Sequence, residues 1–299
     1  MLVDAANLYF RAYYALPESL TAPDGRPVNA IRGYLDMTAA LLERRRPTRH
    51  VACLDADWRP AFRVELVPSY KAHRVADDGG EQIPDTLAPQ VPLLLDVLAA
   101  FGLCTAGASG FEADDVIATL ASRDADSVEI VSGDRDLLAL ATERITVLYT
   151  GKGIAKLAVT GPDEVRERYG VTAERYPDFA VLRGDPSDGL PGVPGVGEKT
   201  AAALVSRFGS VESIVEAALA GDDGFPAGAA ARVRTAREYL AVAPAAVRAR
   251  LDVPVDDLDD ALPSAPRDPE ALATLVDSLG IDTSVRRLQA AVVAARSGR

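Results

Sequence analysis

Carboxylate side chains follow several short apolar segments of this 299-residue chain, at positions where β-strands are expected to end. They are Asp4, Asp55, Glu112, Asp114, Asp115, Asp134 and Asp136. Because the carboxyl ends of parallel strands share one edge of a sheet, residues that follow separate strands would converge there. Crowded carboxylates repel one another, and a hard divalent cation with oxygen ligands relieves that repulsion. The pattern therefore predicts a site for magnesium or manganese.

A further acidic pair, Asp185 and Asp188, lies in a turn rich in glycine and proline, so both side chains could point toward the same cleft. Two cations about 4 Å apart could then activate a water and orient a phosphodiester. The chain has only two histidines and two cysteines, which disfavours zinc. Each acidic residue alone could equally be a helix cap or a solvated loop residue. Their recurrence at four strand ends favours the metal site.

A glycine-bearing turn that opens a helix follows this pair and predicts a phosphate-binding site. Gly195 and Gly197 leave backbone N–H groups open to an anion, and Lys199 and Thr200 follow at the start of the helix. This is the helix-hairpin-helix signature, which reads the sugar-phosphate backbone of duplex DNA without reading bases. An ordinary turn between two helices is the alternative.

Basic and aromatic residues gather in the segment before the third acidic cluster. Lys71 and Arg74 are three residues apart and would share a helix face from which they could grip a scissile phosphate. Tyr70 could stack on an unpaired terminal base, and Arg63 is a further candidate for DNA contact. The alternative is a solvated basic helix start. Residues 75–82 look flexible and could bridge the cleft around a single-stranded 5′ end.

The elements that must hold these residues alternate between strands and helices. Strand-type apolar segments occur at residues 1–3, 51–54, 128–131 and 145–149. Helical periodicity occurs over residues 30–43, 89–101, 113–122 and 136–141. The alternation predicts an α/β fold with a mostly parallel sheet. From residue 163 onward the strand signal fades, so we expect a helical second domain, a loop at 256–270 and a last helical pattern over 268–295.

The composition fits a cytoplasmic globular protein. With 48% hydrophobic residues the chain can bury a substantial core, and no apolar run reaches the ~18 residues of a membrane helix. We expect no membrane partner, and we expect Cys53 and Cys104 to be buried reduced thiols. The net charge of -12 argues at first against a nucleic-acid partner, yet carboxylates that hold cations count toward it. Charge alone fits an ordinary acidic cytosolic protein equally well.

Six ordered motifs resemble those of the flap endonuclease family, and within it the 5′-nuclease domain of bacterial DNA polymerase I. They are Leu2-Val3-Asp4, Leu54-Asp55 with Phe62-Arg63, Tyr70-Lys71-Ala72-His73-Arg74, Phe111-Glu112-Ala113-Asp114-Asp115, Ser132-Gly133-Asp134-Arg135-Asp136, and Gly184-Asp185-Pro186-Ser187-Asp188 followed by Gly195-Val196-Gly197-Glu198-Lys199-Thr200. The resemblance implies a PIN-like nuclease domain over residues 1–162, a mostly parallel sheet flanked by helices, with a helical arch at about 68–95. It also implies a helical DNA-binding region over residues 163–299, with the helix-hairpin-helix motif at about 184–210.

The same resemblance implies a structure-specific 5′ nuclease, both 5′-3′ exonuclease and flap endonuclease, that serves replication and repair. Its substrates would be DNA with 5′ flaps, frayed ends or gaps, cut by a stand-alone monomer in the bacterial cytosol or nucleoid. All nine acidic residues named above match the family's metal ligands, and Lys71 and Arg74 match its catalytic arch residues. The implied cofactors are two divalent cations, Mg²⁺ or Mn²⁺, and K⁺ at the helix-hairpin-helix.

Two departures from the family pattern are visible. The segment from Asp55 to Phe62 is one residue longer than the usual spacing, so either Asp55 or Asp57 could meet the metal. Gly189 stands where the family commonly has asparagine. Two rival functions are a non-catalytic module that binds branched DNA and a PIN-type ribonuclease. The complete acidic set argues against the first, and the glycine turn argues against the second.

Overall fold

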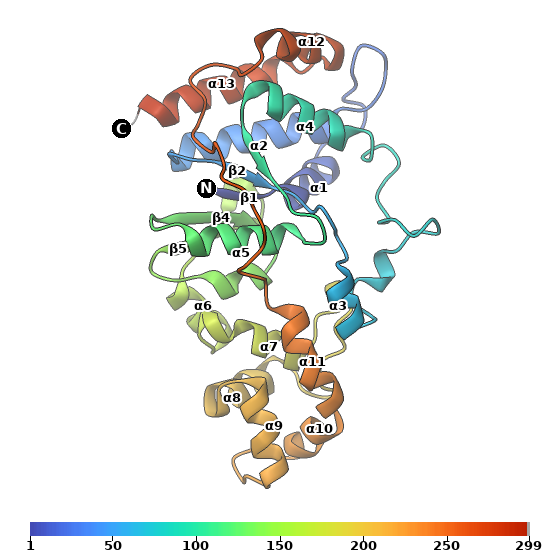
Figure 1. Ribbon diagram of the computed structural model, residues 1–299, viewed down its shortest axis with the longest axis vertical. Coiled ribbons are helices and arrows are strands. Elements are labelled where there is room, and N and C mark those ends of the chain that lie inside the picture. The colour runs from blue at the N-terminus through green and yellow to red at the C-terminus, as the bar shows by residue number, and fades with distance from the viewer. Residues whose placement is uncertain (298–299) are drawn as a thin grey trace.

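The computed structural model describes residues 1–297 and has a six-stranded sheet near the middle of an elongated molecule (Figure 1). The strands are β1 (Leu2–Asp4), β2 (Val51–Cys53), β3 (Cys104–Ala106), β4 (Val128–Ser132), β5 (Ile145–Tyr149) and β6 (Ala158–Thr160). Their order is β3-β2-β1-β4-β5-β6, with β6 antiparallel to β5 and all other neighbours parallel. The predicted mostly parallel sheet is confirmed. The sequence did not predict β3 and β6, because these edge segments are only partly buried and show no continuous apolar run of the kind that β1 and β2 have.

Helices cover both faces of the sheet. One face carries α1 (Ala5–Ala15), α2 (Asn29–Arg45) and α4 (Gln90–Phe101), and the other carries α5 (Ala113–Arg123). Side chains alternate along a strand, so Leu2 packs in the core with α5 while Val3 packs in the core with α2 and α4. The helices predicted over 30–43, 89–101 and 113–122 are present within two residues of these bounds. The segment predicted as a helix over 136–141 is a 3-10 helix, η2 (Asp136–Leu140).

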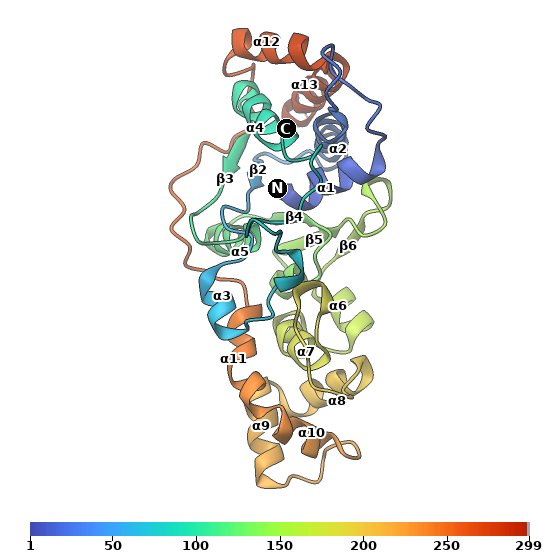
Figure 2. The ribbon, with the colours of Figure 1, turned by 90° about the vertical axis from the view of Figure 1, so that its right-hand side faces the viewer.

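A group of shorter helices extends away from the sheet (Figure 2). Between β5 and β6, at the sheet, the chain forms the 3-10 turn η3 (Ile154–Lys156). The group itself consists of α6 (Pro162–Tyr169), α7 (Tyr176–Arg183), α8 (Glu198–Phe208), α9 (Val211–Ala220), α10 (Ala229–Thr235) and α11 (Arg237–Val247), with the 3-10 turns η4 (Ala173–Arg175) and η5 (Pro186–Asp188). Their apolar residues join the core that contains α5, so this group and the sheet share one packed interior.

The last two helices do not belong to that group. After α11 an extended segment runs back past α5 to α12 (Pro269–Leu279) and α13 (Asp282–Ser297), which pack against α4 and α2 (Figure 1). Leu272, Leu279 and Leu288 are buried in the core of those helices. The helical region expected over 163–299 is therefore divided between two cores. The single helical pattern predicted over 268–295 breaks at Gly280, which adopts φ +64°.

The helical arch expected at about 68–95 is absent from this structure. After α3 (Ala61–Leu66) the chain forms only the one-turn 3-10 helix η1 (Ala72–Arg74) before α4 begins. An isolated antiparallel bridge joins Val75 to Glu81, and the rest is loop. Glycine and proline are frequent in this segment and disfavour a helix there.

Among residues 1–297, no helix is both long and apolar enough to cross a bilayer. Cys53 and Cys104 are free thiols, as predicted. Cys53 is buried, but Cys104 is only half-buried because β3 lies at the edge of the sheet.

Candidate active site

Asp4 lies at the carboxyl edge of the sheet, as the last residue of β1 and the N-cap of α1. Its Oδ1 accepts a hydrogen bond from the Asn7 N–H at 3.0 Å, and its Oδ2 accepts one from Ser132 Oγ at 2.7 Å. Ser132 ends β4, the parallel neighbour of β1, and its Oγ also accepts from the Asp134 N–H at 2.9 Å. Two adjacent strand ends thus bring Asp4 and Asp134 into one cleft, as the sequence predicted.

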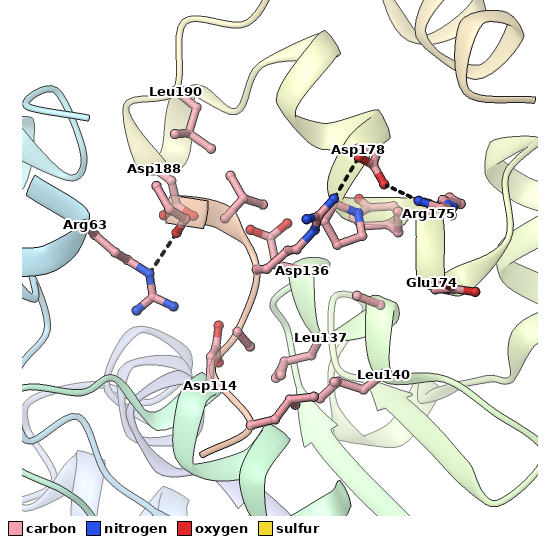
Figure 3. A pocket seen from close by; sticks show the side chains of 18 of the residues that line it. Arg63, Asp114, Asp136, Leu137, Leu140, Glu174, Arg175, Asp178, Asp188 and Leu190 are labelled. Atoms are coloured by element: carbon pink, nitrogen blue, oxygen red, sulfur yellow. Dashed lines mark hydrogen bonds and ion pairs between the residues drawn. The ribbon is translucent and has the colours of Figure 1, made fainter. Parts of the chain in front are cut away.

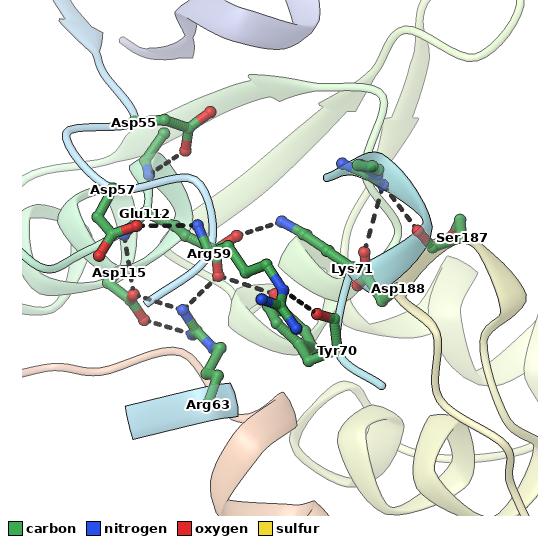
Figure 4. Close-up of polar contacts among 12 residues, drawn as sticks. Asp55, Asp57, Arg59, Arg63, Tyr70, Lys71, Glu112, Asp115, Ser187 and Asp188 are labelled. Atoms are coloured by element: carbon green, nitrogen blue, oxygen red, sulfur yellow. Dashed lines mark hydrogen bonds and ion pairs between the residues drawn. The ribbon is translucent and has the colours of Figure 1, made fainter. Parts of the chain in front are cut away.

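Asp55, rather than Asp57, faces this cleft (Figure 4). Asp55 Oδ1 accepts a hydrogen bond at 2.7 Å from the N–H of Ala113, the first residue of α5. Asp57 Oδ1 instead accepts from the Arg59 N–H at 3.0 Å and caps its own loop. The extra residue in the segment from Asp55 to Phe62 is therefore accommodated in the loop, and the first acidic residue keeps its place.

Two cavities meet at the acidic residues. The first, of about 570 Å³, is lined among others by Asp4, Asp55, Asp134, Lys71 and Arg74. The second, of about 540 Å³, lies between η2 and the helical group and is lined among others by Asp136, Asp188, Leu137, Leu140 and Leu190 (Figure 3). Glu112 and Asp114 line both cavities. The acidic residues therefore form the boundary between a polar cleft and a partly apolar chamber.

Burial and mutual repulsion raise the pKa values of these carboxyl groups. Burial, together with the charges of Asp55 and Asp134, raises the pKa of Asp4 to about 7. Burial and the charge of Asp134 also raise the pKa values of Asp114 and Asp136 well above the usual range of aspartate. Such a cluster favours a bound cation, because a positive charge would allow the carboxyl groups to ionise together.

Asp134 is the common neighbour of two groups of carboxylates. Its charge raises the pKa values of Asp4, Asp114, Asp136 and Asp188. The charge of Asp185 adds to this effect at Asp136 and Asp188. Within residues 1–297 no three acidic, histidine or cysteine side chains enclose a single point, so the donors are spread along the cleft. The buried Asp136 Oδ1 accepts no hydrogen bond, and this all-oxygen donor set suits a hard divalent cation.

Lys71 faces the carboxylates from the segment after α3 (Figure 4), and Arg74 of the same segment lines the polar cleft. Lys71 Nζ forms an ion pair with Glu112 Oε1, and Arg74 Nη2 lies 3.5 Å from Asp188 Oδ1. Burial opposes the charge of Lys71, but Glu112 and Asp188 outweigh burial and raise the pKa of its ammonium group. The predicted shared helix face is in fact the single turn η1, and it still brings both cations to the cleft.

Arg63, Tyr70 and Asp115 are almost completely buried, although Arg63 and Tyr70 line the second cavity. Their exposed fractions are 3%, 5% and 0%. Arg63 pairs with Asp115 through two N–H···O bonds of 2.7 and 2.8 Å, and the Tyr70 hydroxyl donates to Glu112 Oε2 at 2.8 Å. Because the Arg63 guanidinium group and the Tyr70 hydroxyl are already paired inside the protein, this packing disfavours DNA contact by Arg63 and base stacking by Tyr70. The Asp115 carboxylate is directed into an ion pair with Arg63, which also binds Glu112.

The departure from the family pattern at Gly189 has a steric reason. Gly189 adopts φ +70°, and a Cβ atom there would lie 2.0 Å from Ser69 O. The segment before Lys71 docks at this point, because Ser69 Oγ donates to Gly189 O at 2.7 Å. Beside it the Lys71 N–H donates to Asp188 O at 2.9 Å. Glycine thus allows the close approach that holds Lys71 beside Asp188.

We expect Gly189→Ala to lower the free energy of unfolding by about 1–3 kcal/mol, because it adds both backbone strain and a clash with Ser69. Chemical denaturation would measure the change. Gly25→Ala is the matched control, since Gly25 adopts φ +89° with nothing within 4 Å of its Cβ position. Equal losses in the two variants would show that the docking contact adds nothing.

The glycine turn lies exposed before α8. Gly195 adopts φ +78°, and Gly197 is the N-cap residue of α8. Lys199 is exposed and Thr200 half-buried in the first turn of that helix. The Arg232 side chain of α10 donates from Nη1 to Gly195 O at 3.1 Å and braces the turn. The accessible start of α8, with the positive charges of Lys199 and Arg232 beside it, suits a phosphate ligand.

Models of one protein family match both parts of the chain. The model of the 5′-3′ exonuclease N-terminal resolvase-like domain matches residues 1–170, and that of the 5′-3′ exonuclease C-terminal SAM fold matches residues 171–270. The chain belongs to the 5′-3′ exonuclease family. A 5′-3′ exonuclease of Mycobacterium tuberculosis is 48% identical over 308 residues, which cover 98% of this chain and 97% of that protein.

Two further comparisons place this exonuclease family member among its relatives. DNA polymerase I of Mycobacterium bovis is 45% identical over 220 residues, which cover 72% of this chain and 24% of the polymerase. Among solved structures, a bacteriophage T5 flap endonuclease in a complex with DNA and metal ions has a TM-score of 0.64 at 19% identity, covering 99% of this chain and 98% of that one. The structural likeness concerns the fold. The resemblance inferred from the motifs is confirmed, and the chain is a nuclease.

The sequence analysis assigned no role to two residues that hold the site of this exonuclease together. Ser132 bridges Asp4 and Asp134, as described above. Asn7 Oδ1 accepts hydrogen bonds from the Gly133 N–H at 2.9 Å and from a threonine hydroxyl of the next strand end. Both positions lie within three residues of a predicted acidic ligand, which is the signal that could have identified them.

Proposed function

We propose that this exonuclease hydrolyses DNA phosphodiesters at 5′ ends and 5′ flaps with two divalent cations, Mg²⁺ or Mn²⁺. The observation that carries the proposal is that two clusters of acidic residues have Asp134 as a common neighbour, with Lys71 and Arg74 in the adjoining cleft. One cation would be held by residues from Asp4, Asp55, Glu112 and Asp114, and the other by residues from Asp136, Asp185 and Asp188, with Asp134 between them. Bound cations would lower the pKa of an attacking water and neutralise charge on the phosphate.

The remaining residues would orient the substrate. Lys71 and Arg74 line the polar cleft, where they can donate to the non-bridging oxygens of the scissile phosphate. Gly197 and Lys199 at the start of α8 would hold a phosphate of the adjoining duplex. Glu81, in the long loop between η1 and α4, lines the polar cleft, so we place an unpaired 5′ strand beside this loop. Support for a DNA substrate comes from the T5 flap endonuclease, which was solved with DNA and metal ions.

The test is cleavage of a labelled 5′-flap DNA, with Mg²⁺ or Mn²⁺ and with EDTA. Metal-dependent cutting near the flap junction, faster than cutting of single-stranded or continuous duplex DNA, is the expected result. Flap binding without any cutting would instead support the non-catalytic module, and preferred cutting of the matching RNA would support the ribonuclease. We further propose that the protein acts as a monomer in the bacterial cytosol. Replacing KCl with NaCl in the same assay tests K⁺ at the helix-hairpin-helix.

Lys199→Ala should reduce the slope of log affinity against log salt concentration by about 1, because one phosphate contact is lost. Fluorescence anisotropy with flap DNA in Ca²⁺ would measure binding over a range of KCl concentrations. Lys156→Ala is the matched control, since Lys156 is an exposed lysine of η3, at the sheet. An unchanged slope in Lys199→Ala would remove this lysine from the DNA interface.

Mg²⁺ should stabilise the protein more at pH 8 than at pH 6. The folded-state pKa of Asp4 is raised to about 7, so its proton stabilises the metal-free protein at low pH, and this contribution is lost as the pH rises through 7. Below pH 7 the cation must displace that proton. At 100 times its Kd, Mg²⁺ should add about 2.7 kcal/mol at pH 8, measurable by thermal unfolding at constant ionic strength. Equal stabilisation by Mg²⁺ at both pH values would contradict cation binding at the carboxyl groups whose pKa values are raised.

A further inference from the structure

A buried arginine lies directly behind the acidic residues. Arg63 belongs to α3, is 3% exposed, and binds groups from two other parts of the chain, the start of α5 (Figure 4) and the end of α11. Its Nη1 donates to Glu112 Oε2 and, at 2.8 Å, to Asp115 Oδ2, while its Nη2 donates to Asp115 Oδ1 at 2.7 Å. Its Nε donates to Ala246 O of α11 at 2.9 Å. Every nitrogen of the guanidinium group therefore has a partner.

Glu112 is fixed by this arrangement. Its Oε2 accepts from Arg63 and from the Tyr70 hydroxyl, and its Oε1 accepts from Lys71 Nζ. Glu112 lines both cavities, and its carboxylate is one of the proposed cation ligands. It can bind the same cation as the other ligands only if its carboxylate points toward that cation. A carboxylate that accepts hydrogen bonds on both oxygens has little freedom to rotate. The direction of the Glu112 carboxylate therefore depends on the position of the Arg63 guanidinium group.

Asp115 holds the Arg63 fork. It pairs with both terminal nitrogens of Arg63, and its oxygens also accept the Glu112 N–H at 3.2 Å and the Arg250 N–H at 2.8 Å. The paired fork has one geometry, because two parallel N–H···O bonds fix both its position and its plane. Asp115 thus orients Arg63, and Arg63 orients Glu112.

The same pair reaches the helical group. Arg63 binds the carbonyl of Ala246 near the end of α11, and Asp115 binds the backbone of Arg250 in the segment that follows. Thr119 Oγ1, one turn further along α5, donates to Arg250 O at 3.1 Å. The end of α11 is therefore tied to the start of α5, where Glu112 and Asp114 lie.

We propose that Arg63 and Asp115 are a positioning pair that sets the direction of Glu112 for cation binding and ties it to α11. The inference rests on the proposed two-cation function. It replaces the predicted roles of these residues, which were DNA contact for Arg63 and metal ligation for Asp115. Residues that orient a metal ligand commonly change metal affinity or activity by about 10–100-fold when they are altered.

The experiment compares Arg63→Lys, Asp115→Asn and the double variant with the parent. Mn²⁺ binding to the full chain without DNA would be measured by electron paramagnetic resonance, and flap cleavage would be titrated with Mn²⁺. We expect each single variant to bind Mn²⁺ about 10–100-fold more weakly and to regain cleavage at high Mn²⁺. The double variant should bind Mn²⁺ no more weakly than the single variant with the lower affinity, because both changes break the same pair.

Arg144→Lys is the matched control. Arg144 is a half-buried arginine whose side chain donates only to the backbone carbonyls of Ala121 and Asp126, at the far end of α5. It should leave Mn²⁺ affinity unchanged even where it lowers Tm. If Arg63→Lys does not fold, Asp115→Asn alone decides the question.

Two outcomes would overturn the proposal. Mn²⁺ affinity in the folded Arg63→Lys and Asp115→Asn variants equal to that of the parent would show that the pair is only structural. A further loss of Mn²⁺ affinity when Asp115→Asn is added to Arg63→Lys would show that Asp115 acts on the cation independently of Arg63. Absence of Mn²⁺ binding by the parent protein would instead contradict the proposed function itself, so the two failures are distinguishable.

Discussion

Replacing Asp134 with alanine should lower the rate of 5′-flap cleavage by about a thousandfold. Asp134 is the carboxylate whose charge acts on both acidic groups, raising the pKa values of Asp4 and Asp114 on one side and of Asp136 and Asp188 on the other. Its removal therefore affects both proposed cations, whereas loss of an outer carboxylate affects one. Single-turnover cleavage at saturating Mg²⁺ would measure the change.

Loss of activity in this variant should not come from unfolding. Removing one of several crowded carboxylates relieves repulsion, so we expect metal-free Asp134→Ala to be at least as stable as the parent. It should also lose most of the stabilisation that Mg²⁺ gives the parent at pH 8. Asp126→Ala is the matched control, because the Asp126 side chain is 84% exposed and lies at the opposite end of β4. Flap cleavage by Asp134→Ala within tenfold of the parent would contradict the two-cation site.

Lys71→Gln should lower single-turnover cleavage by about 100- to 1000-fold, with little change in the affinity for flap DNA. Lys71 lines the polar cleft within the acidic cluster, since its ammonium group pairs with Glu112 and its backbone N–H binds Asp188 O. Glutamine keeps much of the side-chain length and a hydrogen-bond donor but not the charge. The expected loss therefore reports charge stabilisation at the phosphate rather than binding of the duplex.

Lys156→Gln controls for the loss of one lysine from an acidic protein, because Lys156 is exposed on η3 and lines neither cavity at the acidic residues. It should cleave as the parent does. A fall in DNA affinity as large as the fall in rate would show that Lys71 contributes to binding alone. Cleavage unchanged in Lys71→Gln would remove it from the proposed catalytic residues.

Much of the site could be predicted from the sequence because its signals are local. A strand of parallel type ends where its apolar segment ends, so Asp4 and Asp134 could be placed at the sheet edge without knowledge of the tertiary fold. The glycine turn before α8 is equally local, since Gly195 adopts the left-handed φ that glycine favours. The parallel sheet followed from the alternation of strands and helices, which the structure confirms.

The short elements could not be predicted with the same success. β3 and β6 are only partly buried and so lack the continuous apolar run that identifies β1 and β2, and β3 pairs with β2, which is distant in the sequence. The segment from 67 to 89 contains cations and aromatic residues at helical spacing, but glycine and proline prevent a regular helix. The amino-acid composition of this segment could not distinguish a helical arch from a loop that packs against Gly189 through Ser69.

The charged residues at the strand ends, and therefore the class of chemistry, can be identified from the order of residues alone. Which of those charges face the cleft depends on how distant segments pack together. Adjacent residues on a helix point about 100° apart, so Asp114 faces the cleft while Asp115 faces Arg63. Arg63 is a buried partner rather than a surface cation because α11, nearly two hundred residues later, packs over it. Contacts between segments so distant leave no pattern in the local sequence, and these contacts determine burial and pairing.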